Sequence, residues 1–136
     1  MKSVLLDTHR WVWSLAGDPR LSDRATSAML RAETVLVNPI SFFEIGQKVR
    51  LGKWPEMAPF VGDLPALLER QGGGVAGLDQ GICLRAAIMD WAHRDPFDRM
   101  LAATALRKRE QNFVTRHRNH HERVKGSRSV RRVRRR

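Results

Sequence analysis

Four carboxylates stand where a strand should end or a helix should begin: Asp7, Glu44, Asp95 and Asp98. Carboxylate oxygens are ligands that Mg²⁺ and Mn²⁺ prefer, and a bound divalent ion can promote hydrolysis of a phosphodiester bond. Each acid also has a structural explanation, because helix starts favour negative charge by about 0.3–1 kcal/mol. Asp7 is the hardest to explain in that way. A short acid directly after a buried strand loses its hydration unless a cation pairs with it.

Short apolar segments alternate with helical segments along the chain. Strands are expected at residues 4–6, 35–37, 75–78 and 113–115, and helices at 9–16, 23–32, 41–50, 64–70, 79–91 and from 96 onward. This alternation predicts an α/β fold, in which helices flank a parallel sheet. The functional crevice of such a sheet lies beyond the carboxyl ends of its strands, so the acids are expected there.

Helix-capping signals suggest how three of the acids are placed. Ser41 and Glu44 have the spacing of a capping box, which predicts that a helix opens at Ser41. Asp95 suits an N-cap, Pro96 suits the first helical position, and Asp98 then falls in the first turn.

The composition bounds the class of protein. The 136 residues suffice for one domain with one core, and 42% of them are hydrophobic. The single cysteine, Cys83, excludes a disulfide framework. No apolar run reaches the roughly 20 residues that span a membrane. An acid as early as Asp7 argues against a secretory signal, so a cytoplasmic location without membrane contact is expected.

The net charge of +11 is concentrated at one end of the chain. Residues 1–106 carry 12 basic and 12 acidic side chains, whereas residues 107–136 carry 13 basic and 2 acidic ones. Residues 116–136 contain few aliphatic side chains and cannot bury enough apolar area to offset their ordering entropy. The expected organisation is therefore a domain at residues 1–115 and a disordered basic tail at residues 116–136.

Three motifs together resemble PIN-domain ribonucleases, and most closely the VapC-type toxins of bacterial toxin–antitoxin pairs. They are Val4-Leu5-Leu6-Asp7-Thr8-His9, the Ser41-x-x-Glu44-Ile45 helix with Lys48 and Leu51-Gly52-Lys53, and His93-Arg94-Asp95-Pro96-Phe97-Asp98-Arg99-Met100-Leu101-Ala102. The resemblance covers about residues 3–116 and implies a PIN-like fold. It also implies a metal-dependent endoribonuclease, the toxin of such a pair, that hydrolyses RNA and binds a cognate antitoxin. Family members often form homodimers.

The resemblance also implies roles for individual side chains. Asp7, Glu44 and Asp98 would hold Mg²⁺ or Mn²⁺, and Asp95 would be a supporting acid of the catalytic set. Thr8, Ser41 and Thr115 could support these acids through hydrogen bonds.

Basic and aromatic residues could contact the RNA. Arg94 and Arg99 could bind phosphate, although Arg99 could equally pair with Asp95 on the helix surface. Aromatic side chains could stack on bases, or could instead belong to the core or an interface: Trp11, Trp13, Trp54, Trp91, Phe42 and Phe43. His9 and His93 could act as general acids, but a metal-linked mechanism needs neither.

The chain departs from the family pattern after its last expected strand. The family usually has an acid where Val114-Thr115-Arg116-His117 places His117. Either the basic tail is an RNA-binding arm, or the reading frame has shifted near residues 117–120; the abrupt change in charge favours the frameshift. Two alternatives to the active enzyme follow: a catalytically impaired PIN-like protein that binds antitoxin or RNA, and a basic nucleic-acid-binding protein whose acids only cap helices.

Overall fold

The computed structural model describes residues 3–111. The chain divides into two units, Met1–Thr104 and Ala105–Arg136. The first unit contains three strands, β1 (Ser3–Leu6), β2 (Thr34–Val37) and β3 (Gly74–Val75). Its helices are α1 (Thr8–Ala16), α2 (Asp23–Arg31), α3 (Pro39–Arg50), α4 (Leu64–Arg70) and α5 (Gln80–Ile88), with two short 3-10 helices, η1 (Pro55–Met57) and η2 (Val61–Asp63). Residues 96–104 are also helical, and residues 105–111 of the second unit are helical too.

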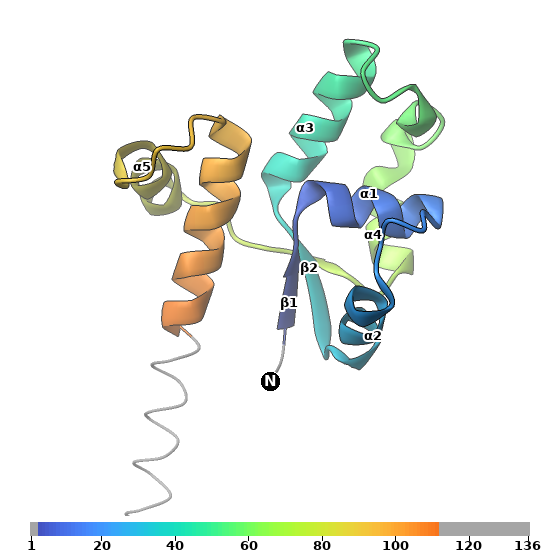
Figure 1. Cartoon of the computed structure of the whole chain (residues 1–136), viewed down its shortest axis with the longest axis horizontal. Helices are drawn as coiled ribbons and strands as arrows, with labels where there is room; N and C mark the ends of the chain where they lie inside the picture. The colour runs from blue at the N-terminus through green and yellow to red at the C-terminus, as the bar shows by residue number, and fades with distance from the viewer. Residues whose placement is uncertain (1–2, 112–136) are drawn as a thin grey trace, which may run out of the picture. The chain divides into compact units, whose positions relative to one another are not determined.

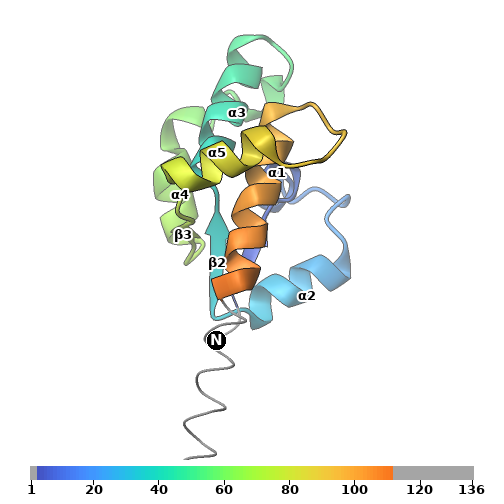
Figure 2. The same cartoon turned by 90° about the vertical axis from the view of Figure 1, so that its left-hand side faces the viewer.

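The three strands form a parallel sheet in the order β1-β2-β3 (Figure 1). Helices pack on both sides of this sheet. Figures 1 and 2 show α5 and the helical residues 96–104 on one side, and α1, α2 and α4 on the other. This is the predicted α/β fold of PIN-like type. The expected strand at residues 113–115 lies outside the described residues.

Two clusters of buried side chains hold these layers together. The larger packs α1, α3 and α4 against the strands, and its centre contains Trp11, Val37 and Ile45, all with no exposed surface. The indole Nε1 of Trp11 donates to Oε1 of Gln71 at 3.0 Å, so burial leaves this polar atom satisfied. The smaller cluster joins α5 to the helical residues 96–104 through Ile82, Ala86 and Ala103.

Most helix and strand boundaries agree with those predicted from the sequence, with three differences. Helix α5 ends at Ile88 instead of Trp91, and β3 is shorter than the expected 75–78. Helix α3 begins at Pro39, before the predicted start at Ser41. Asn38 is its N-cap, and Pro39 occupies the first turn, where proline has no hydrogen bond to lose. The predicted capping box of Ser41 and Glu44 is therefore wrong.

Candidate functional site

The first two strands end at the same level and deliver two polar side chains to one edge of the sheet. Leu6 is paired with Val37 in the parallel register, so Asp7 and Asn38 follow at corresponding positions. Oδ1 of Asp7 accepts from the backbone N–H of Arg10 at 2.8 Å and caps α1. Oδ1 of Asn38 accepts from the N–H of Ile40 at 2.9 Å and caps α3. Two helix N-termini therefore open at this edge.

Asp7 is less buried than its position after a strand suggested. Its side chain is 41% exposed and forms an ion pair with Arg10. The expectation that this acid loses its hydration was wrong, because the chain turns into α1 directly after β1 and leaves the carboxylate as a cap at the surface. Capping gives Asp7 a structural role beside any role in metal binding.

A buried hydroxyl pair joins the first turns of α1 and α3. Oγ1 of Thr8 and Oγ of Ser41 lie 2.8 Å apart, and both side chains are buried. Thr8 follows Asp7 directly, and Ser41 lies three residues before Glu44. The hydrogen bond thus fixes the position of one acid-bearing turn against the other.

Glu44 is the buried acid of this edge. The residue is only 4% exposed, and its Oε1 accepts from Nζ of Lys48 at 3.2 Å. Its second oxygen, Oε2, is buried and has no hydrogen-bond partner among the described residues. A buried carboxylate oxygen without a partner carries a desolvation penalty of about 1–3 kcal/mol or more. The atom is therefore suited to accept a cation or a donor from outside the chain.

Asp95 and Asp98 occupy the start of the helix at residue 96, as the sequence predicted. Oδ1 of Asp95 accepts from the N–H groups of Phe97 at 2.8 Å and Asp98 at 3.2 Å, which confirms its capping role. The Asp98 side chain is 48% exposed, and its Oδ2 lies 2.5 Å from Nε2 of His93.

Neighbouring residues bring the three acid-bearing turns together. The rings of Phe43 and Phe97 lie 5.9 Å apart, and these residues directly precede Glu44 and Asp98. With the hydroxyl pair described above, this contact links the starts of α1, α3 and the helix at residue 96. These contacts join the three turns, and the common location of the Asp7, Glu44 and Asp98 carboxylates stays a prediction.

The carboxylates themselves do not form a ready ligand set. Within residues 3–111, no three His, Cys, Asp or Glu side chains are grouped closely enough to hold a metal ion. Instead, each acid contacts a basic side chain of its own segment, namely Arg10, Lys48 or His93. Carboxylate oxygens are the donors that Mg²⁺ and Mn²⁺ prefer, so the type of donor fits a divalent cation, and Oε2 of Glu44 has no partner within the described residues.

Arg99 has a structural role that the sequence did not reveal. Its guanidinium donates to the carbonyl oxygens of five residues at the end of α5 and in the following loop: Ala86, Ala87, Met89, Trp91 and His93. The last carbonyls of a helix lack partners within the helix, and here an arginine supplies them. The expected ion pair with Asp95 is replaced by these bonds. They also engage the donors that an RNA phosphate would need.

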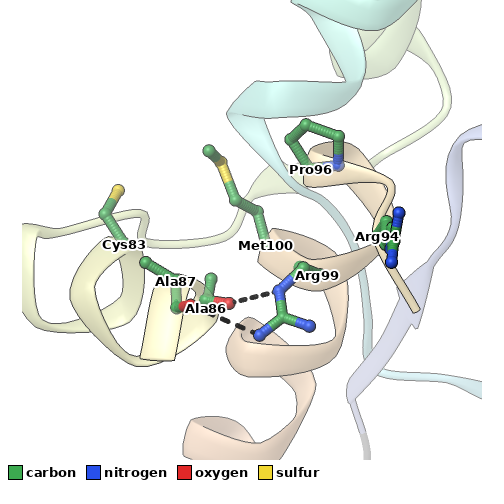
Figure 3. A pocket seen from close by; sticks show the side chains of 7 residues that line it. All are labelled: Cys83, Ala86, Ala87, Arg94, Pro96, Arg99 and Met100. Atoms are coloured by element: carbon green, nitrogen blue, oxygen red, sulfur yellow. Dashed lines mark hydrogen bonds between the residues drawn. The ribbon is translucent and has the colours of Figure 1, made fainter. Parts of the chain in front are cut away.

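Arg94 and Arg99 line a cavity of about 250 Å³ together with side chains of α5 and of the helix at residue 96: Cys83, Ala86, Ala87, Pro96 and Met100. Figure 3 shows the Arg99 guanidinium pointing toward the carbonyls of Ala86 and Ala87, with Arg94 at the other end. Arg94 is exposed and stays a candidate for phosphate contact.

Asn38 and Thr104 are polar residues that the sequence interpretation missed, and the pairing of Lys48 with Glu44 was not foreseen either. Nδ2 of Asn38 donates to Oγ1 of Thr104 at 2.6 Å, and both side chains are buried. This bond ties the end of β2 to the helical residues 96–104. The Asn38-Pro39 pair is a recognisable helix start, so Asn38 could have been found. Thr115 and His117 lie outside the described residues.

No helix in the described part of the chain combines the length and hydropathy needed to cross a membrane. A search of curated proteins and a search of solved structures each gave no match to the chain. The comparison with family models did give a match. The family model described as PIN domain matches residues 4–126, which is most of the chain.

Proposed function

Since the chain belongs to the PIN domain family, whose members are in general metal-dependent nucleases, we propose that it is a metal-dependent endoribonuclease. The observation that carries this proposal is the buried Glu44, whose Oε2 has no hydrogen-bond partner within residues 3–111, at an edge that also carries Asp7 and Asp98. A carboxylate in this state is suited to bind a cation.

Asp7, Glu44 and Asp98 would hold the ion, which is Mg²⁺ or Mn²⁺. When bound, such an ion lowers the pKa of a coordinated water and stabilises charge on the phosphate. Glu44 is the fixed member, because it is buried and anchored by Lys48. Asp7 and Asp98 would exchange their contacts with Arg10 and His93 for the ion. Arg10 and His93 are exposed beside these acids and would be further candidates for phosphate contact.

Other residues would fix the positions of the turns that carry these acids. Thr8 and Ser41 fix the starts of α1 and α3 relative to each other through their buried hydrogen bond. Asp95 caps the turn that carries Asp98 and so orients it. Thr115 is proposed to support the same edge. Arg94, exposed at the rim of the cavity, is a further candidate for phosphate contact.

The biological role follows from the resemblance to VapC-type toxins. We propose that the chain is the toxin of a toxin–antitoxin pair, that it acts on cytoplasmic RNA, and that a cognate antitoxin protein binds it. A homodimer is also proposed. These proposals rest on the sequence motifs. They are more specific than the match to the PIN domain family, which gives neither a toxin role nor a partner.

A second candidate is a catalytically impaired PIN-like protein that binds RNA or antitoxin without cleaving. The observation that favours it is the pairing of all three acids with basic side chains of their own segments. The absence of an acid at His117 points the same way.

Cleavage of a labelled single-stranded RNA in the presence of Mn²⁺ separates the two candidates. The variants are Glu44→Gln, which keeps the shape but removes the charge, and the matched control Glu69→Gln, at an exposed position of α4. We expect Glu44→Gln to reduce the cleavage rate at least about 100-fold, while Glu69→Gln leaves it unchanged. RNA binding without cleavage by the unaltered chain would support the impaired protein. If the Glu44→Gln and Glu69→Gln proteins cleaved the RNA at equal rates, the proposed role of Glu44 in metal binding would be refuted.

A further inference from the structure

The acids of the proposed metal-binding edge are divided between the two buried clusters. Asp7 caps α1 and Glu44 lies in α3, and both helices pack in the larger cluster around Trp11 and Ile45. Asp98 lies in the first turn of the helix at residue 96, which packs on α5 through the smaller cluster. Because the clusters are separate, apolar packing within each of them does not fix the position of Asp98 relative to the other two acids.

A hydrogen bond between two buried side chains joins the segments that belong to these clusters. Nδ2 of Asn38, the N-cap of α3, donates to Oγ1 of Thr104 at 2.6 Å. Asn38 has no exposed surface, and Thr104 is only 4% exposed. Thr104 lies on the same helix as Asp98, so the bond attaches the helix that carries this acid to the start of the helix that carries Glu44.

Further hydrogen bonds fix the direction of this bond. Oδ1 of Asn38 accepts from the backbone N–H of Ile40 at 2.9 Å, so the amide presents its Nδ2 to Thr104. The hydroxyl of Thr104 donates to the carbonyl oxygen of Met100 at 2.8 Å, so its oxygen is the acceptor for Asn38. Because each atom has a single role, the bond specifies one arrangement of the two segments, which a pair of apolar side chains would not do.

A second contact holds the other end of the same helix. The ring of Phe97 lies 5.9 Å from that of Phe43, which belongs to α3. Phe97 and Thr104 are about two helical turns apart, roughly 10 Å along the helix axis. Asp98 lies between these two points of attachment, so together they fix both the position and the tilt of the segment that carries it. The hydrogen bond is the buried member of the two contacts, because Phe43 is 60% exposed.

We propose that Asn38 and Thr104 are positioning residues of the metal-binding edge. Their buried hydrogen bond holds the turn that carries Asp98 where this acid can complete the ligand set of Asp7 and Glu44. The ion itself would touch neither Asn38 nor Thr104. Replacing residues that orient ligands in this way typically weakens metal binding by about 10–100-fold. The proposal rests on the proposed nuclease function and names two residues, far apart in the sequence, that this function requires.

Substitutions at buried positions separate positioning from stability. Thr104→Val keeps the shape of the side chain but removes the acceptor, so Nδ2 of Asn38 loses its partner. Thr104→Ser retains the hydroxyl and is expected to rescue the bond. Ile82→Val is the matched control, because it removes a methylene from the smaller cluster and leaves the hydrogen bond intact. If Thr104→Val does not fold, Asn38→Ser takes its place, since a serine still caps α3 but lacks the amide that reaches Thr104.

Two measurements on the full chain are compared across these variants, each shown to be folded by circular dichroism. Without metal, nuclear Overhauser effects between the rings of Phe43 and Phe97 report whether the two turns stay together. We expect these effects to weaken in Thr104→Val and to persist in Thr104→Ser and Ile82→Val. Titration with Mn²⁺, followed by electron paramagnetic resonance, gives the metal affinity. We expect Thr104→Val to bind Mn²⁺ about tenfold more weakly, whereas Thr104→Ser and Ile82→Val bind it as tightly as the unaltered chain.

The outcomes distinguish this inference from the nuclease proposal. If Thr104→Val bound Mn²⁺ as tightly as Ile82→Val, or kept the ring contacts of the unaltered chain, the hydrogen bond would only stabilise the fold. The positioning role would then be overturned, while the metal site would stand. If the unaltered chain bound no Mn²⁺, the proposed nuclease would be refuted instead. The ring contacts need no metal, so they would still decide whether Asn38 and Thr104 hold the two turns together.

Discussion

Nζ of Lys48 lies 3.2 Å from Oε1 of Glu44, while the other oxygen of that carboxylate is buried and has no partner among the described residues. One oxygen of Glu44 is thus paired with a cation from within the chain, and the other lacks a donor in the described part of the chain. Nζ of Lys48 also lies over the indole ring of Trp54, 4.4 Å from its centroid. Lys48 therefore connects the buried acid of α3 to the segment that follows this helix.

Replacing Lys48 by methionine tests the importance of this ion pair for stability. The change keeps most of the side-chain volume but leaves the buried Glu44 without its cation. We expect the free energy of unfolding, measured in urea at neutral pH, to fall by about 1–3 kcal/mol. The exposed Lys53→Met is the control and should change stability by less than about 0.5 kcal/mol. Equal effects of the two substitutions would show that the pair contributes nothing.

Arg99→Lys tests the contacts with the five carbonyl oxygens. A lysine has three donors on one nitrogen and cannot reproduce the planar fork of the guanidinium. We expect the free energy of unfolding to fall by at least about 2 kcal/mol, because hydrogen bonds to charged groups contribute about 1.5–3 kcal/mol each and are only partly additive. Arg94→Lys, in the same cavity but exposed, should be close to neutral. Denaturant unfolding of both variants would decide this, and a stable Arg99→Lys protein would contradict the assigned role.

Asp18 provides a test that depends on pH. Side-chain hydrogen bonds from Arg20, followed by its backbone N–H, lower the pKa of Asp18 from 3.8. A carboxyl whose pKa is lower in the folded chain adds stability above the unfolded pKa, and this stability is lost as pH falls through the folded value. We expect an NMR titration to place the Asp18 midpoint below 3.8, and Arg20→Ala to raise it. An unchanged midpoint in the variant would show that Arg20 is not held by Asp18.

The basic residues 116–136 differ in composition from the rest of the chain. We propose that the reading frame has shifted near residues 117–120, since the charge pattern breaks there and His117 replaces an expected acid. The family match continues to residue 126, so similarity to the family does not stop at Thr115. Sequencing the same locus in other isolates should reveal a different frame from this point. An identical basic tail in every isolate would contradict the frameshift and favour an RNA-binding arm.

Local signals in the sequence predicted much of the fold. Asp95 caps the helix that its position suggested, because N-capping depends only on a few neighbouring residues. Ser22 and Asp79 cap α2 and α5 close to the starts expected for those helices. The short apolar runs before Asp7 and Asn38 are indeed parallel strands. At the start of α3 the capping-box spacing of Ser41 and Glu44 was misleading, because Asn38 is the N-cap and Pro39 occupies the first turn.

Contacts between distant segments were beyond the sequence alone. The Thr8–Ser41 and Asn38–Thr104 hydrogen bonds depend on how whole elements pack, which no local pattern encodes. The role of Arg99 depends on the path of the loop after α5, which brings carbonyl groups toward it. The acids were identified by type and position, but their pairing with nearby basic residues emerged only from the structure.

Binding of Mn²⁺ tests the central claim most directly, because it does not depend on the RNA or on a partner. The full chain is titrated with Mn²⁺, and free ion is measured by electron paramagnetic resonance. We predict that the chain binds Mn²⁺, that Glu44→Gln weakens this binding at least about tenfold, and that Glu69→Gln leaves it unchanged. A chain that binds no Mn²⁺, or one whose affinity is the same with Glu44→Gln, would contradict the assignment of this edge as a metal-binding site.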